Sequence, residues 1–438
     1  MDQIHQFVQA IKDEIIQCRR DFHRYPESGW TEFRTAALIA QQLDSLGYTL
    51  KLGEAAVKQE AMLGVPSEAE LAAHMKRAQA EGADEKWLKH LAGGRTGIVA
   101  DLVCGEGPVV ALRFDIDAND VQEAQDEQHS PAQAGFASCH DGVMHACGHD
   151  GHSAIGLAVA KVLASLKDQL AGTVRLIFQP GEEGSRGARA MVAAGAVDGV
   201  DYILGLHIGF QAQQTGTLIC STGKFLATTK YDVTYRGKPA HAAAAPEEGK
   251  NALLAAAACA LNLHAISRHS QGATRITVGT LQAGQGRNVI PPNALMKLET
   301  RGETSELDEY MTTEARRIIK AAAAMYDVDC EITEVGGTKS GESSPELAAK
   351  VRAIASKMGF FQELIEYSAF GATEDFSHFM SVVQAGGGQG TYLMLGSELA
   401  AGHHNNYFNF NEEILAPGTE LLVRTVDALI GSCQGKLS

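Results

Sequence analysis

Hydrophobic and polar positions follow two different patterns along this 438-residue chain, which changes character near residue 223. In the first part, apolar runs alternate between strand-like and helix-like spacing. They predict helices at 3–20, 32–46, 153–166 and 188–194, and strands at 97–104, 109–114, 173–178 and 202–206. Strands that alternate with helices favour an α/β fold with a mainly parallel sheet flanked by helices. The Gly-Glu-Gly-Pro turn at 105–108 predicts that the first two strands form a hairpin.

The second part of the chain has a different order of elements. It predicts strands at 228–235, 274–281, 294–300 and 328–334, and helices at 251–265 and 305–325. This βαββαβ order favours a small open, ferredoxin-like sheet with two helices on one face. Helix and strand signals then resume at 345–358, 390–395 and 415–429. We therefore expect one domain formed by residues 1–222 and 338–438, interrupted by a second domain at 223–337.

Residues 55–95 form a charged, helical insertion within the first domain. Ser67 and Glu70 have the spacing of a capping box at a helix start. The segment is either a solvated surface insertion or a part of the chain that assists assembly or covers the site.

Composition narrows the class of protein. A formal net charge of −16 argues against nucleic acid or an anionic membrane surface as a partner. The N-terminus has no apolar signal core, and the most apolar run, 252–263, is too short to span a bilayer. The eight cysteines are scattered without a paired pattern, as is typical of the reducing cytoplasm. We therefore expect a cytoplasmic, globular protein.

The segment 145–152, His-Ala-Cys-Gly-His-Asp-Gly-His, concentrates metal-binding residue types. A glycine separates Cys147 from His149, so in an extended backbone both side chains point to the same face. A thiolate and an imidazole on one face are half of a transition-metal site.

Further candidate ligands follow the predicted strands. They are Glu182 and Glu183 after 173–178, His207 after 202–206, and His403 and His404 after 390–395. Open α/β sheets bind ligands beyond the carboxyl ends of their strands, so these segments can meet in one crevice. The combined set is Cys147, His149, Glu183, His207 and His404. These donors suit Zn²⁺, Mn²⁺, Co²⁺ or Ni²⁺, and five exceed the four of a closed zinc site, which favours two metals that share a ligand.

Two carboxylate pairs near this set have candidate roles. Glu182 is adjacent to a ligand, so it is a candidate base that takes a proton from water and delivers it to a leaving nitrogen. Asp115 and Asp117 share one face at the end of the strand 109–114 and could orient the imidazoles. The alternatives are an ordinary charged loop for the glutamates and a salt-bridged strand end for the aspartates.

The motifs together resemble the M20 metallopeptidases. The resemblance rests on Arg113-x-Asp115-x-Asp117, the segments 19–27 and 145–152, Gln179–Gly184, His207-Ile208, Gly371–Ser377, and a late histidine before Tyr407-Phe408. It covers nearly the whole chain and is closest to the amidohydrolase branch with the hippurate and auxin-conjugate hydrolases. Within this branch, the insertion at 55–95 and the segments 135–139 and 400–405 resemble enzymes that act on p-aminobenzoyl-glutamate.

The resemblance implies specific roles for residues. It implies a binuclear manganese or zinc site held by the five ligands above, with Glu182 as general base and acid. His404 is preferred to His403 because it stands four residues before Phe408. The inserted domain becomes a lid and dimerisation domain, through which the chain forms a homodimer or a heteromer with a related subunit. In it, His241 matches a histidine that reaches a partner's active site, and Asn288 and Arg301 match positions that bind the substrate carboxylate.

The expected reaction is metal-dependent hydrolysis of an N-acyl or N-aroyl amino acid, with p-aminobenzoyl-glutamate as the sharpest candidate. Alternatives are a hippurate or N-acetyl amino acid amidohydrolase, a cysteine hydrolase with Cys147 as nucleophile, and a non-catalytic, substrate-binding subunit. Two departures leave the substrate open. Asp117-Ala-Asn-Asp120 replaces the family's Asp-Ala-Leu-Pro, and His404-Asn-Asn406 replaces its His-Ser-Pro.

Overall fold

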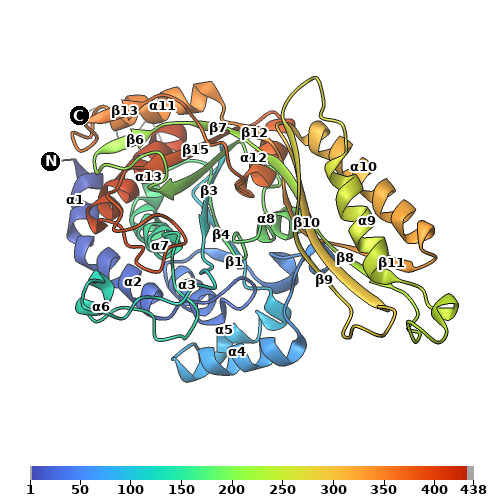
Figure 1. Ribbon diagram of the computed structural model, residues 1–438. Helices are drawn as coiled ribbons and strands as arrows, with labels where there is room; N and C mark the ends of the chain where they lie inside the picture. Colours follow the sequence, from blue (N-terminus) through green and yellow to red (C-terminus); the bar gives the residue numbers. More distant parts are fainter. Residues whose placement is uncertain (1, 432–438) are drawn as a thin grey trace. The chain divides into compact units, whose positions relative to one another are not determined.

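The computed structural model describes residues 2–431. The chain divides into two compact units, which are described separately (Figure 1). The first comprises Met1–Gly223, Glu342–Phe370 and Asp375–Ser438, and the second comprises Lys224–Gly341 and Gly371–Glu374.

The first unit is built on an eight-stranded sheet in the order β1-β2-β4-β3-β5-β15-β6-β13. The strands are β1 (Thr49–Lys51), β2 (Ile98–Val103), β3 (Val109–Asp115), β4 (Thr173–Gln179), β5 (Tyr202–Ile208), β6 (Thr217–Ile219), β13 (Glu363–Ile365) and β15 (Gln389–Leu395). The central pairs β4–β3, β3–β5 and β5–β15 are all parallel. The predicted mainly parallel α/β layer is therefore confirmed. The short strands β7 (Thr222–Phe225), β12 (Gly341–Glu342) and β14 (Ser368–Ala369) form a separate sheet.

The predicted hairpin between β2 and β3 is wrong, because β4 lies between them. β2 pairs antiparallel with β4, and β3 pairs parallel with the other edge of β4. The turn at 105–108 crosses the start of β4: Cys104 N–H donates to Gly172 O and Thr173 N–H donates to Pro108 O. The Gly-Pro turn therefore spans a strand that arrives much later in the sequence.

Helices cover the sheet of the first unit. They are α1 (Gln3–Ala10), α2 (Lys12–Arg24), α3 (Phe33–Ser45), α4 (Glu68–Ala80), α5 (Glu85–Leu88), α6 (Ser130–Gln133), α7 (His149–Ser165), α8 (Gly187–Ala193), α11 (Pro345–Ala355), α12 (Phe376–Ala385) and α13 (Leu415–Ile430). Short 3-10 turns of this unit occur at Gly53–Ala55, Gln59–Ala61, Ala92–Gly94, Lys167–Gln169 and Glu412–Ile414, and the second unit has one at Pro246–Glu248. The single helix expected over 3–20 is interrupted at Ile11, whose φ of −110° and ψ of 9° end α1.

Helix α7 occupies the centre of the first unit. Its residues are buried almost throughout, and it packs against α2, α13 and β3. Ile155, Val159 and Leu163 are fully buried in the main core. Because His149 is the first residue of this immobilised helix, the ligand segment begins on a rigid support.

The insertion at 55–95 packs into the first unit. The capping box at Ser67 and Glu70 is present at the start of α4. One face of α4 is exposed, but α4 and α5 both contact α3. Leu71, Trp87 and Leu88 belong to the main hydrophobic core. The interpretation as a merely solvated surface segment is therefore wrong.

The second unit contains a four-stranded antiparallel sheet in the order β11-β8-β10-β9. Its elements are β8 (Ala227–Arg236), α9 (Ala252–His264), β9 (Thr274–Ala283), β10 (Asn293–Gly302), α10 (Ser305–Met325) and β11 (Asp329–Thr338). Figure 1 shows α9 and α10 together on one face of this sheet, and Val233, Met296 and Ile319 are buried between the layers. The expected βαββαβ order is confirmed. Among residues 2–431, none of the helices combines the length and the apolar character that crossing a membrane requires.

Candidate metal centre

Cys147 and His149 meet through a turn instead of a strand. Gly148 has φ 92° and ψ 10°, a left-handed conformation that glycine adopts without steric cost, and α7 begins at the next residue. The expectation of an extended backbone here is therefore wrong. Nevertheless, the ligand atoms of Cys147, His149 and His207 all lie within 4.8 Å of one another.

Backbone carbonyls orient two of these imidazoles. The Nδ1–H of His149 donates to Asp117 O at 2.8 Å, and the Nδ1–H of His207 donates to Ile208 O at 2.8 Å. In the neutral ring, this arrangement leaves each Nε2 with a lone pair, the usual preparation of a metal-binding histidine. His207 Nε2 lies 3.4 Å from Cys147 Sγ. His149 Nε2 is buried and has no hydrogen-bond partner among residues 2–431. A metal ion would satisfy this orphaned atom.

A second group of ligand atoms includes the same cysteine. Cys147, Glu183 and His404 also have ligand atoms within 4.8 Å of one another. His404 Nε2 lies 3.2 Å from Glu183 Oε1. Two groups that share Cys147 fit the paired-metal arrangement expected from the sequence.

His403 has a different environment from its neighbour. Its Nε2–H donates to Ile208 O at 3.1 Å, and its ring stacks on Phe210 with centroids 4.1 Å apart. Burial lowers the pKa of His403 to about 4. This side chain is occupied by structural contacts, which supports the choice of His404 as the ligand.

The third histidine of the motif is fully occupied by protein groups. His152 Nδ1–H donates to Asp115 Oδ1 at 2.5 Å, and His152 Nε2 accepts the N–H of Ile208 at 3.1 Å. Arg113 also donates to Asp115, at 2.6 Å. Although burial opposes ionisation, the nearby charges of His149 and Arg113 lower the pKa of Asp115 well below its ordinary value. Asp115 therefore positions His152 while keeping its negative charge near His149.

Asp117 supports the glutamate doublet as well as a histidine. Its carboxylate accepts the backbone N–H of Glu182 at 3.0 Å and of Glu183 at 2.9 Å. Its carbonyl accepts the Nδ1–H of His149 at 2.8 Å, and its carboxylate lies 3.5 Å from the same nitrogen. Asp117 therefore helps to position the candidate base Glu182, the candidate ligand Glu183 and the imidazole of His149.

Glu32 is a site residue that the sequence did not indicate. Its buried carboxylate accepts the N–H of Gly181 at 2.9 Å and the hydroxyl of Thr96 at 2.7 Å. Burial raises the pKa of Glu32 to about 8, and the negative charge of Asp117 adds to the effect. Glu32 and Asp117 together fix the loop that carries the doublet. No motif could reveal Glu32, because only the folded chain brings it to Gly181.

The environment of Cys147 does not favour a nucleophile. Its side chain is 4% exposed. Burial and the charge of Glu183 raise the pKa of the Cys147 thiol well above its ordinary value. Nucleophilic cysteines need the opposite shift and access to substrate. The cysteine-hydrolase alternative therefore loses support.

The remaining expected site residues lie in the second unit. His241 Nδ1 accepts the N–H groups of Ala243 at 3.2 Å and Ala244 at 3.1 Å, so its neutral form carries the proton on Nε2. Asn288 is a neighbour, because its carbonyl accepts the N–H of Ala242. Arg301 lies on β10, away from this turn.

The strand register between β9 and β10 identifies Arg275 as a further positively charged residue that the sequence did not indicate. Arg275 of β9 stands directly opposite Arg301 of β10. Ile276 and Thr300, the next residues in these strands, are buried, so the arginines occupy the face of the sheet opposite α9 and α10. Like charges at opposed positions are unfavourable unless an anion is near. Glu299, two residues before Arg301 on the same face of β10, partly supplies this anion, because its Oε1 pairs with Arg301 Nε at 2.8 Å.

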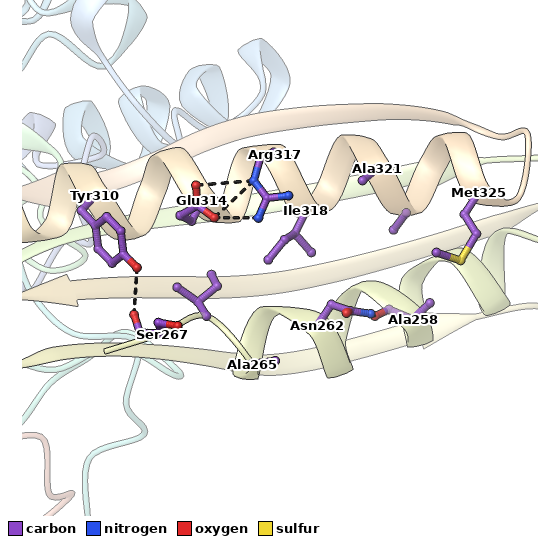
Figure 2. Close-up of a pocket in the computed structure, with 12 residues that line it drawn as sticks. Ala258, Asn262, Ala265, Ser267, Tyr310, Glu314, Arg317, Ile318, Ala321 and Met325 are labelled. Carbon is purple, nitrogen blue, oxygen red and sulfur yellow. Dashed lines mark hydrogen bonds and ion pairs between the residues drawn. The ribbon is translucent and has the colours of Figure 1, made fainter. Parts of the chain in front are cut away.

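A pocket of about 350 Å³ lies between α9 and α10 in the second unit (Figure 2). Tyr310 Oη donates to Ser267 O at 3.0 Å, and Arg317 pairs with Glu314 at 2.7 Å. Because these groups already bond within the pocket wall, we place the candidate chemistry at the cysteine–histidine cluster.

A buried thiol, imidazoles and carboxylates at the carboxyl edge of an α/β sheet define a metal-dependent hydrolase. Residues 111–428 match the family described as Peptidase family M20/M25/M40, and the chain belongs to this family. As a member of it, the chain is an enzyme that hydrolyses amide bonds.

Similar proteins extend over the whole chain. A p-aminobenzoyl-glutamate hydrolase subunit of Escherichia coli (strain K12) is 47% identical over 427 residues, which are 97% of this chain and 98% of that protein. The indole-3-acetyl-aspartic acid hydrolase of Enterobacter agglomerans is 48% identical over 427 residues, with the same coverage of both chains. The crystal structure of an aminobenzoyl-glutamate utilization protein from Klebsiella pneumoniae superimposes with a TM-score of 0.85 and 40% identity, covering 97% of this chain and 98% of that chain.

A further solved structure bears on the metals. The Bacillus subtilis YXEP protein, described as a dinuclear metal binding peptidase of the M20 family, has a TM-score of 0.65 and 25% identity, covering 96% of this chain and 99% of that chain. The two ligand groups around Cys147 are consistent with such a dinuclear centre.

Proposed function

We propose that this chain hydrolyses the amide bond between an aromatic acyl group and an acidic amino acid, with p-aminobenzoyl-glutamate as the first candidate substrate. Two relatives of nearly equal identity are named for p-aminobenzoyl-glutamate and for indole-3-acetyl-aspartate. Both compounds join an aromatic acyl group to a dicarboxylic amino acid. This shared chemistry, more than either name, defines the proposed substrate class.

The observation that carries the proposal is the pair of ligand groups that share Cys147. Cys147, His149, Glu183, His207 and His404 would hold two Mn²⁺ or Zn²⁺ ions. When bound, such a pair polarises an amide carbonyl and lowers the pKa of a water molecule. The buried, unpartnered Nε2 of His149 supports the fit of this donor set.

Glu182 is the proposed general base and acid. It stands next to a ligand, and Asp117 fixes its backbone. Its carboxylate takes a proton from the attacking water and returns it to the leaving nitrogen, which would otherwise depart as an unstable anion.

The second unit supplies the proposed substrate contacts. Because its Nδ1 accepts two backbone N–H groups, His241 has Nε2–H available as a donor, which in a partner's active site would face the oxygen that becomes negative during attack. Arg301 and Asn288 lie apart within one chain, so we propose that each would contact a carboxylate of the amino acid separately, or that the two would come from different copies of the chain. Arg275, opposite Arg301, gives a second guanidinium that an aspartate or glutamate side chain would neutralise.

We also propose that the chain assembles through its second unit, as a homodimer or with a related chain. The similar Escherichia coli protein is itself named as one subunit of its hydrolase, which supports a heteromeric form. The presence of all five ligands and of Glu182 favours an active chain over a silent one.

The decisive experiment is an assay of the purified chain with Mn²⁺ or Zn²⁺ against a panel of conjugates. The panel contains p-aminobenzoyl-glutamate, indole-3-acetyl-aspartate, hippurate and an N-acetyl amino acid. The proposal requires the highest kcat/KM for the conjugates of acidic amino acids. A higher kcat/KM for hippurate or for the N-acetyl amino acid would contradict the proposed substrate class. Inactivity toward the whole panel would favour a non-catalytic role.

A further inference from the structure

A second cluster of metal-binding side chains lies in the first unit, at the end of the insertion. Glu81 follows α4 as its C-cap, and Cys139 and His140 lie in the segment between α6 and α7. Their ligand atoms all lie within 4.8 Å of one another. A thiol, an imidazole and a carboxylate form a donor set that suits zinc and similar divalent ions.

His140 is oriented as a metal-binding histidine. Its Nδ1–H donates to Pro26 O at 2.7 Å, because a carbonyl oxygen only accepts. In the neutral ring this leaves a lone pair on Nε2, which faces Glu81 Oε1 at 2.7 Å. A lone pair and a carboxylate oxygen at this distance repel each other unless a positive charge lies with them. The His140 side chain is only 10% exposed, so water screens this repulsion poorly.

The surroundings allow a cation to enter and stay. Cys139 is exposed, which provides a path from solvent. The nearby guanidinium of Arg34 pairs with Asp21 at 2.8 Å, and that of Arg77 pairs with Glu27 at 3.1 Å. Arg77 Nε also lies 3.8 Å from Glu81 Oε2, the carboxylate oxygen that does not face His140. These pairs reduce the repulsion that a divalent ion would meet.

We propose that Glu81, Cys139 and His140 bind a divalent transition-metal ion, zinc foremost, separately from the paired centre at Cys147. Three protein ligands leave one position of a tetrahedral zinc ion for water. The ion links the insertion at 55–95 to the segment that leads into the ligand motif at 145–152. Because binding replaces the thiol proton, zinc affinity at this site increases with pH.

Alkylation of Cys139 in the unmodified protein tests the proposal without any variant. The protein, with its paired centre loaded, is treated with iodoacetamide with and without added Zn²⁺, and modified peptides are quantified by mass spectrometry. Zinc should slow modification of Cys139 by about tenfold or more, because a bound thiolate is shielded. Cys330 in the second unit serves as the internal control, and its modification rate should not change. An equal rate at Cys139 with and without zinc overturns the proposal.

Metal counting provides the second measurement. Equilibrium dialysis against Zn²⁺ and elemental analysis should give one ion fewer per chain for Cys139→Ser and for His140→Gln than for the unmodified protein. Cys104→Ser and Asp141→Asn, a cysteine elsewhere and the residue after His140, are matched controls that keep the full count. If Cys139→Ser and His140→Gln also keep it, the cluster is only an ion pair between His140 and Glu81.

Discussion

His404 Nε2 lies 3.2 Å from Glu183 Oε1, which connects the loop after β15 to the loop after β4. The Glu183 carboxylate raises the pKa of His404. Although burial of Glu183 opposes the shift, the contact with His404 helps to lower the pKa of Glu183 to about 2. Opposite charges thus hold two remote loops beside Cys147. The proposed centre is therefore largely assembled by protein contacts alone, which limits the reorganisation needed when ions bind.

Cys147→Ser should reduce the metal content of the chain. Because Cys147 belongs to both ligand groups, the substitution weakens both positions and not just one. Elemental analysis after gel filtration measures the loss, with Cys104→Ser as the control for removal of a thiol elsewhere. An unchanged metal content would exclude Cys147 as a ligand.

Glu182→Gln should retain metal and lose turnover. The amide keeps the size of the side chain but cannot accept the proton from water, so kcat should fall by about 10²- to 10⁴-fold. Steady-state assays and elemental analysis of the same preparation separate the two effects. Activity close to that of the unmodified protein would remove Glu182 from the mechanism.

Arg275→Ala should weaken recognition of acidic amino acids. Loss of a charge-assisted hydrogen bond costs about 1.5–3 kcal/mol, so KM for p-aminobenzoyl-glutamate should rise roughly ten- to hundredfold. Hippurate lacks the second carboxylate, and its KM should change little. A similar rise in KM for both substrates would mean that Arg275 does not bind the side-chain carboxylate of the amino acid.

Stability should fall with pH through the titration of Glu32. The folded state holds a proton on Glu32 up to about pH 8, whereas a free glutamate loses it near 4.5. Between these values the folded state binds more protons than the unfolded state, so the free energy of unfolding decreases as pH rises. Glu32→Gln should flatten this dependence, as measured by denaturant unfolding at several pH values. Parallel curves for the two proteins would contradict the shifted pKa.

Trp87→Ala should show that the insertion contributes to the core. Trp87 is 6% exposed, and large-to-small changes of buried aromatic residues cost about 3–5 kcal/mol. Lys76→Ala, on the exposed face of α4, should change the free energy of unfolding by less than about 0.5 kcal/mol. Chemical denaturation measures the free energy of unfolding of both variants. Equally small changes for the two would contradict a contribution of the insertion to the core.

Local patterns in the sequence predicted the parts of the molecule that depend on neighbouring residues. The βαββαβ order followed from periodicity, and the candidate ligands followed from their places after predicted strands, such as His207 after β5. Short elements such as β6 and β13 have too few residues for a periodic signal.

Features that depend on remote residues were not predictable in the same way. The pairing of β2 with β4 cannot be deduced from a Gly-Pro turn. Glu32 and Arg275 acquire their surroundings only from tertiary packing and strand register. The turn at Gly148 brought Cys147 and His149 together by a route other than the expected strand.

The position of β4 between β2 and β3 in the sheet affects when the candidate metal centre forms during folding. Residues 98–115 cannot complete their ladders until residues 173–179 have been synthesised and have docked. His207 reaches its final position later still, because its strand, β5 (Tyr202–Ile208), follows β4 in the chain and pairs with β3. Contacts this distant in sequence form slowly. We infer that the nascent chain acquires its metals late, and that Cys147 stays a solitary thiol until the sheet around it has closed.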